Sequence, residues 1–249
     1  MIEDWRFYAV AVPAVMLVGL AKGGFSGLGA IALPMLAFVI DPVRAAAILL
    51  PILIVQDVVG VWAFRRTVDW PVLAWMLPGA AGGVALGYCF AANVGAEAVM
   101  AAVGAISALF GGYRLWAARH AVPRRAARLP EWMGALFGVG AGFTSQIAHA
   151  GQPPFQLWVV PRNLGPQQLV GTTAVFFAAL NWIKVPAYLA LGQLGPANLL
   201  TAAALLPAAT ASTMAGVWLV RRIDPDRFYA AIHWLMILVG VALVWEALA

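Results

Sequence analysis

Charged side chains are scarce in this sequence. Only 10% of its 249 residues are Asp, Glu, Lys or Arg, while 63% are hydrophobic. A soluble domain carries about 25% charged residues. So little polar surface cannot cover a globule in water, which excludes a soluble fold. The chain is therefore expected to lie in a lipid bilayer, where one helical span needs about 20 apolar residues.

Cysteine and histidine are also rare, with one Cys and three His. Cys89 lies in an apolar run and cannot form an internal disulfide. His149 has no Cys or Glu beside it in sequence, so neither a metal site nor another cofactor is expected. The net charge of +5 comes from basic residues in short loops between apolar runs, and this pattern does not indicate nucleic-acid binding.

Six apolar runs are long enough to cross a bilayer as single helices. They cover residues 43–64, 71–92, 96–117, 168–190, 197–220 and 228–248. Two more apolar regions, 5–40 and 132–160, are interrupted by polar, Gly- and Pro-rich segments at 22–29 and 144–154. Each is expected to form a hairpin of two short helices, whose irregular turn must pack inside protein or line a wet cavity. The predicted fold is an all-α polytopic membrane protein of about 8 to 10 helical segments.

The distribution of basic residues predicts the orientation. If each hairpin returns to the side it came from, one side receives 11 of the 15 Lys and Arg residues. Cytoplasmic loops carry the excess of Lys and Arg. The Arg-rich side is therefore predicted to be cytoplasmic, with both termini periplasmic. Two full crossings by each hairpin would give the same distribution and stay open.

The two halves of the chain resemble each other. DPVRAAAILLPILIVQDVVGVW (41–62) aligns with GPQQLVGTTAVFFAALNWIKVP (165–186), and LPGAAGGVALG (77–87) resembles LPAATASTMAG (206–216) after a small insertion. The predicted organisation is an N-terminal repeat (1–120), a cytoplasmic linker (121–130) and a C-terminal repeat (131–249). Each repeat contains one hairpin and three spans, so the second is inverted relative to the first. Transporters with inverted repeats bind substrate near the midplane, where the repeats meet.

The two interrupted regions carry groups that could bind an anion. A helix N-terminus presents unpaired N–H groups and a partial positive charge. The first interruption contributes Gly24, Ser26 and Gly27, and the second contributes Thr144, Ser145, Gln146, His149, Gly151 and Gln152. Pro153 and Pro154 suit the first turn of a new helix. The alternative is that these polar groups only satisfy the backbone freed by each break.

Four polar residues lie inside apolar regions and complete the predicted substrate site. They are Lys22, Asp57, Asn181 and Lys184. Asn181 and Lys184 are three residues apart, which places them on one helix face. A charge at mid-bilayer costs about 2.5–3.5 kcal/mol or more, so it normally faces the protein interior. Asp57 either forms a structural pair with one of the lysines, or balances charge or carries a proton while the lysines attract an anion.

The segments GFTSQIAHAGQPPFQLWVVP (142–161), GTTAVFFAALNWIKVPAYLALG (171–192) and KGGFSGLGAIALP (22–34) resemble the TauE/SafE family of sulfite exporters. The resemblance extends over essentially the whole chain and supports Thr144, His149, Gly151, Pro153, Asn181 and Lys184 as site residues. It implies a secondary transporter, not an enzyme, that exports sulfite or small organosulfonates across the bacterial cytoplasmic membrane. Its expected partners are the lipid bilayer and a small anionic substrate.

Several alternatives stay open at this point. Within the transporter class they are another small anion, such as sulfate or a carboxylate, and proton-coupled uptake. Outside it they are an intramembrane enzyme using Ser145 or Ser26 with His149, and an accessory subunit of a larger complex. Whether the chain forms an oligomer is also left open.

Overall fold

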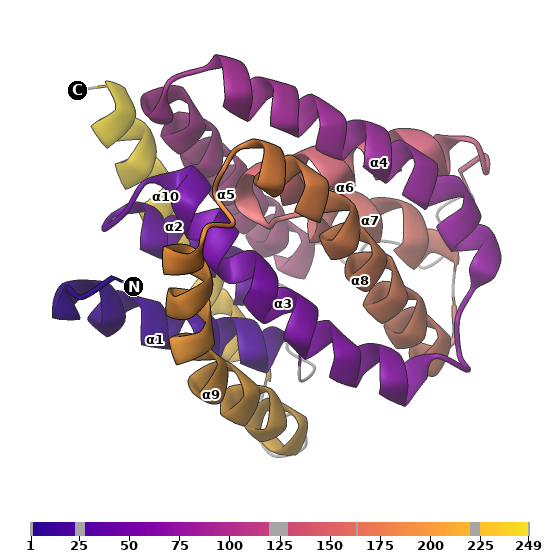
Figure 1. Ribbon diagram of the computed structural model, residues 1–249. Helices are drawn as coiled ribbons and strands as arrows, with labels where there is room; N and C mark the ends of the chain where they lie inside the picture. The colour runs from indigo at the N-terminus through magenta and orange to yellow at the C-terminus, as the bar shows by residue number, and fades with distance from the viewer. Residues whose placement is uncertain (1, 23–27, 120–128, 163, 220–224, 249) are drawn as a thin grey trace.

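In each half of the chain a long helix is followed by a short α-helix with a 3-10 helix beside it, and then by three long helices (Figure 1). The computed structural model describes residues 2–22, 28–119, 129–162, 164–219 and 225–248, and these ranges contain helices but no strand. The first half comprises α1 (Trp5–Lys22), η1 (Leu28–Ile31), α2 (Ala32–Ala37), α3 (Pro42–Phe64), α4 (Trp70–Asn93) and α5 (Ala96–Arg119). The second comprises α6 (Met133–Ala148), α7 (Gln152–Val159), η2 (Val160–Arg162), α8 (Pro166–Ala190), α9 (Pro196–Leu219) and α10 (Pro225–Leu248).

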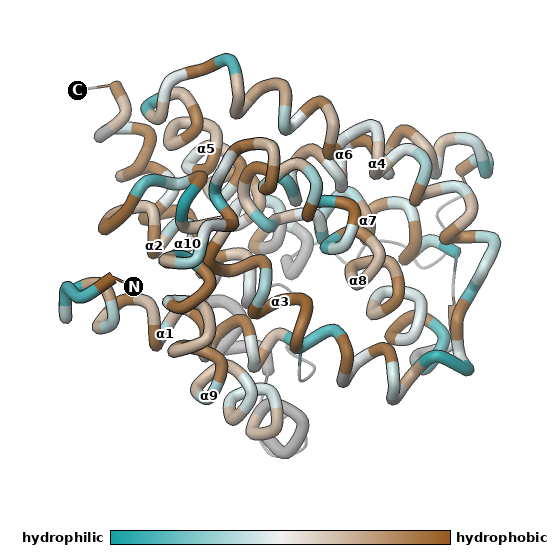
Figure 2. The backbone as a smooth tube through the Cα atoms, viewed as in Figure 1, coloured by the Kyte–Doolittle hydropathy of each residue, from teal (hydrophilic) through white to brown (hydrophobic). Residues whose placement is uncertain are grey.

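The length and composition of the helices confirm the predicted fold class. Within the described residues, six helices are long and apolar enough to cross a membrane. These spans are Trp5–Lys22, Pro42–Trp62, Trp70–Asn93, Ala96–Tyr113, Gln167–Ala190 and Pro196–Ala215. Figure 2 shows hydrophilic segments mainly at helix ends and turns, with one in the middle of α3. The protein is an all-α, polytopic membrane protein.

Helices of the first half pack against helices of the second. The helix α1 lies along α9, and α6 lies along α4. The helices α3 and α8 contact each other, as do α5 and α10. This arrangement places α3 and α8 side by side, and the polar residues Asp57, Asn181 and Lys184 on these helices are buried.

The interrupted regions differ in detail from the prediction of two short helices each. The first helix of each region is long, with 18 residues in α1 and 16 in α6, and only the second is short, with 6 in α2 and 8 in α7. In the second region α6 continues to Ala148, so the break begins at His149 and not at Thr144. The Thr144 hydroxyl donates to the Gly140 carbonyl at 2.8 Å, a bond that a helix interior accommodates.

Candidate functional site

The break after α6 holds His149 in an unusual backbone conformation. His149 has φ 50° and ψ 23° and is the one non-glycine residue with positive φ in the described ranges. Its N–H donates to the Ser145 carbonyl at 3.1 Å, and the next N–H, of Ala150, donates to the Thr144 carbonyl at 3.2 Å. These two bonds close the helix in the left-handed manner that glycine usually provides. Because histidine pays a steric penalty there, its side-chain contacts must hold it in place.

The ring of His149 joins two elements from different halves of the chain. Its Nε2 lies 2.9 Å from the Ala46 carbonyl oxygen on α3. A carbonyl can only accept, so Nε2 carries the proton and Nδ1 of the neutral ring is an acceptor. The Lys184 amine nitrogen lies 2.7 Å from Nδ1. The ring therefore connects the α3 backbone to the side chain of Lys184.

Lys184 is fully buried, with 0% of its surface exposed. Besides His149, its Nζ donates to the hydroxyl of Ser145 at 3.2 Å and to the carbonyl of Ser145 at 3.4 Å. These three contacts match the three donors of an ammonium group, but none is an acid. Within the described residues the ion pairs are Lys22–Asp57 and Arg162–Glu131. A charge on Lys184 is therefore left without a direct ion pair to an acid among these residues.

The carboxylate of Asp57 forms a second cluster beside the first. Its Oδ1 is paired with Lys22, the last residue of α1. Its Oδ2 accepts a hydrogen bond from Asn181 Nδ2 at 2.6 Å. Asn181 and Lys184 lie one turn apart on α8, so this helix joins the two clusters. With both lysines charged, Asp57 neutralises only one, and the combined site has one net positive charge.

Other predicted residues play different parts. Gln152 accepts at its Oε1 from Gln156 Nε2 at 3.1 Å. Gly151 is closely surrounded, because an added Cβ would lie 2.8 Å from the Ala141 carbonyl oxygen. Gln146 is buried, and its side-chain oxygen has no hydrogen-bond partner. The predicted residues Gly24, Ser26 and Gly27 lie outside the described residues.

Two contributors to the site were not predicted. Tyr188 donates from its hydroxyl to the Gln146 carbonyl at 2.6 Å, and its ring stacks on that of His149 with centroids 6.4 Å apart. It follows Lys184 by four residues on α8, so helical spacing alone could have identified it. The Ala46 carbonyl contributes a backbone atom, which no side-chain pattern signals.

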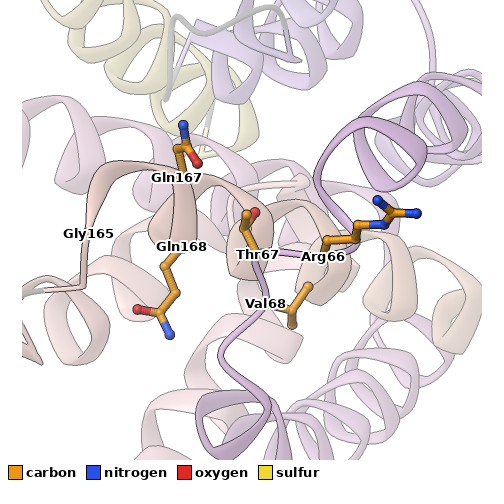
Figure 3. Close-up of a pocket in the computed structure, with 6 residues that line it drawn as sticks. All are labelled: Arg66, Thr67, Val68, Gly165, Gln167 and Gln168. Atoms are coloured by element: carbon orange, nitrogen blue, oxygen red, sulfur yellow. The ribbon is translucent and has the colours of Figure 1, made fainter.

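The larger hollow described in the structure lies away from this site. Its volume is about 640 Å³, and it opens between the turn after α3 and the start of α8 (Figure 3). Its lining residues are Arg66, Thr67, Val68, Gly165, Gln167 and Gln168. A second hollow of about 10 Å³, room for about one water, is lined in part by Gln146 and Tyr188. Lys184 itself is fully buried.

Comparison with known proteins gives a match to one family. The family described as sulfite exporter TauE/SafE matches residues 11–243, nearly the entire chain. No curated protein and no solved structure gives a match.

Proposed function

Because the chain belongs to the TauE/SafE sulfite exporter family, we propose that it is a secondary transporter that exports sulfite or small organosulfonate anions. The observation that carries the proposal is Lys184, which is fully buried and has no acidic partner among the described residues. A buried charge without a counter-charge is costly. An anion that replaced one of the Nζ contacts to Ser145 would supply that counter-charge.

The proposed transport path of the anion runs between the two inverted repeats of the chain. In the alignment of 41–62 with 165–186, Asp57 and Asn181 occupy the same position of each repeat. These two side chains are hydrogen-bonded to each other. Equivalent residues can touch only near the axis that relates the repeats, so this contact supports an axis passing through the site. Such a midplane position is where transporters built from inverted repeats bind substrate.

The arginine distribution supports an orientation in the bacterial cytoplasmic membrane. The turn after α3 contains Arg65 and Arg66, and α7 is followed by Arg162. Basic loops stay on the cytoplasmic side, and this supports the proposal that both termini lie in the periplasm. The 640 Å³ hollow beside Arg66 would then face the cytoplasm, the side from which an exported anion is loaded.

The test is anion binding to the purified protein with and without Lys184. Lys184→Gln should weaken sulfite binding about 100-fold or more, because the anion would lose its counter-charge. Thr173→Ala is the matched control on α8, since the Thr173 hydroxyl donates only to the Leu169 carbonyl of its own helix, and it should bind as the native protein does. Unchanged binding by Lys184→Gln would remove Lys184 from the site.

A panel of anions defines the substrate class. Sulfite and a small sulfonate should compete for the site, while sulfate and a carboxylate should bind more weakly. Stronger binding of sulfate or of the carboxylate would keep the transporter but replace the proposed substrate. Transport by the purified chain in liposomes would separate a self-sufficient transporter from an accessory subunit.

A further inference from the structure

We propose that two equivalent hydrogen bonds, Arg44–Asn198 and Gln168–Asp69, are latches that close opposite ends of the transport path and open alternately. Arg44 Nε donates to Asn198 Oδ1 at 2.9 Å. Gln168 Nε2 donates to Asp69 Oδ2 at 3.2 Å. Each bond joins the two halves of the chain. The inference rests on the proposed function and extends it to the residues that control access.

The sequence repeat makes the two contacts counterparts. The register that aligns residue 41 with 165 aligns Arg44 with Gln168, because both pairs are 124 apart. The register that aligns 77 with 206 aligns Asp69 with Asn198, because both pairs are 129 apart. The same contact thus occurs twice, with the charge on the donor in one case and on the acceptor in the other. Asp69 and Asn198 lie outside the segments 77–87 and 206–216 that set the second register. Arg44 and Gln168 lie within the segments that set the first register, but they are different residue types. Neither register depends on these residues, so their contacts are an independent observation.

The two contacts lie at opposite ends of the molecule. Arg44 is in the first turn of α3, and Asp69 follows the turn at the other end of that helix. Because α3 has 23 residues, it is about 35 Å long. Asp57 and Lys184 are buried at 5% and 0% exposure while both bonds are made. The structure therefore corresponds to a form in which both latches are shut around these two side chains, while the Lys22 side chain beside Asp57 remains 24% exposed.

One latch borders the large hollow. Gln168 lines the 640 Å³ hollow at the start of α8, together with Thr67 and Arg66 (Figure 3). Asp69 also caps α4 by accepting from the Val72 N–H at 3.0 Å. The Asp69 N–H also donates to the Thr172 hydroxyl of α8 at 2.8 Å, so opening this end breaks both bonds and moves the start of α8 away from the start of α4. The hollow could then extend along α8 toward Asn181 and Lys184.

Cysteine labelling of the buried site tests the latches without any substrate. The reporter is Ser145→Cys, nearly isosteric and 2% exposed in the native protein, in a chain whose single Cys is removed by Cys89→Ser. In sealed vesicles, Arg44→Ala should raise labelling by an impermeant thiol reagent from the Arg44 side about tenfold and lower it from the other side. That change corresponds to losing one hydrogen bond to a charged group. Gln168→Ala should do the reverse.

Matched variants separate latching from general damage. Gln167→Ala removes an exposed neighbour in the same hollow and should leave labelling unchanged. Arg44→Gln combined with Asn198→Asp copies the other latch onto this end and should restore native labelling, and Asn198→Ala replaces Arg44→Ala if the latter does not fold. The proposal would be overturned if Arg44→Ala and Gln168→Ala raised labelling equally from the same side, or if neither variant changed labelling. Labelling that follows the latches, together with no sulfite binding by the native chain that retains Ser145, would instead refute the proposed substrate and leave the latches standing.

Discussion

His149 combines a backbone cost with two side-chain contacts. Its left-handed conformation is one that glycine adopts freely, yet the position carries a ring that contacts Ala46 and Lys184. Strained backbone positions of this kind persist where the surrounding contacts over-determine them, and they cluster at functional sites. The histidine is therefore better explained by its role in orienting Lys184 than by the needs of the break itself.

A pair of substitutions at His149 separates the cost of the left-handed backbone from the effect of the ring contacts. His149→Gly and His149→Ala remove the same ring contacts, but only alanine pays the penalty of the left-handed conformation. The glycine variant should be more stable by about 1 kcal/mol, measured as a higher apparent melting temperature in detergent. Both variants should lose sulfite affinity to a similar extent. An alanine variant as stable as the glycine variant would mean that the break relaxes and that its conformation is not fixed.

Residue patterns predicted which polar side chains are buried better than they predicted which of them are in contact. Helical spacing correctly placed Asn181 and Lys184 on one face of α8, and burial of Asp57 followed from its cost in lipid. The choice of Lys22 as the partner of Asp57 was not determined, because either lysine satisfied the charge argument. That choice depends on the rotation of α1 and α8 about their axes. An apolar sequence encodes rotation weakly, since lipid-facing and protein-facing surfaces are both hydrophobic.

At the scale of helices, the contact between α4 and α6 depends on glycine. A Cβ added at Gly83 would overlap the Val139 carbonyl, and one added at Gly142 would overlap the Ala80 carbonyl. The backbones therefore meet directly, as small residues allow between helices in membranes. This contact fixes the position of α6, and α6 carries Ser145 and the break at His149. Helix packing at Gly142, one turn before Ser145, thus helps to determine the geometry of the site.

Two neighbouring glycines of α4 provide a matched test of this contact. Gly83→Ala should destabilise the protein by about 1–3 kcal/mol, because the added methyl must push α6 away. Gly82 has nothing within 4 Å of an added Cβ, so Gly82→Ala should leave stability unchanged or raise it by up to about 1 kcal/mol. Thermal unfolding of both variants in detergent measures the difference. Equal melting temperatures would show that α4 and α6 can separate without cost.

The break in the second interrupted region shows the limit of locating a helix end from sequence alone. The sequence correctly placed Pro153 and Pro154 at the start of a new helix, because proline fits the first turn and disrupts the interior. It placed the beginning of the break too early. Thr, Ser and Gln are tolerated within helices, and the run of polar residues from Thr144 to Gln146 was therefore weak evidence for a break. The true boundary depends on tertiary contacts made by His149.

For the molecule as a whole, the balance of buried charge bears on the direction of transport. The site combines Lys22, Lys184 and Asp57, and Asp57 is already bound by Lys22 and Asn181. This engagement supports a role in charge balance more than one as a free proton carrier. With the cell interior negative, each negative charge that leaves gains about 2.3 kcal/mol per 100 mV. The membrane potential alone can therefore drive export of an anion.

Reconstituted vesicles can distinguish this mechanism from proton coupling. Sulfite efflux should increase when the compartment on the Arg-rich side is made negative, and it should respond little to an imposed pH gradient at constant potential. Asp57→Asn leaves both lysines without an acid among the described residues, so it should slow release of the anion while the dependence on potential is retained. Asn181→Ala, which removes a neutral partner of Asp57, is the comparison. If efflux instead requires a proton gradient, and Asp57→Asn abolishes that requirement, Asp57 is the coupling residue and potential-driven export is wrong.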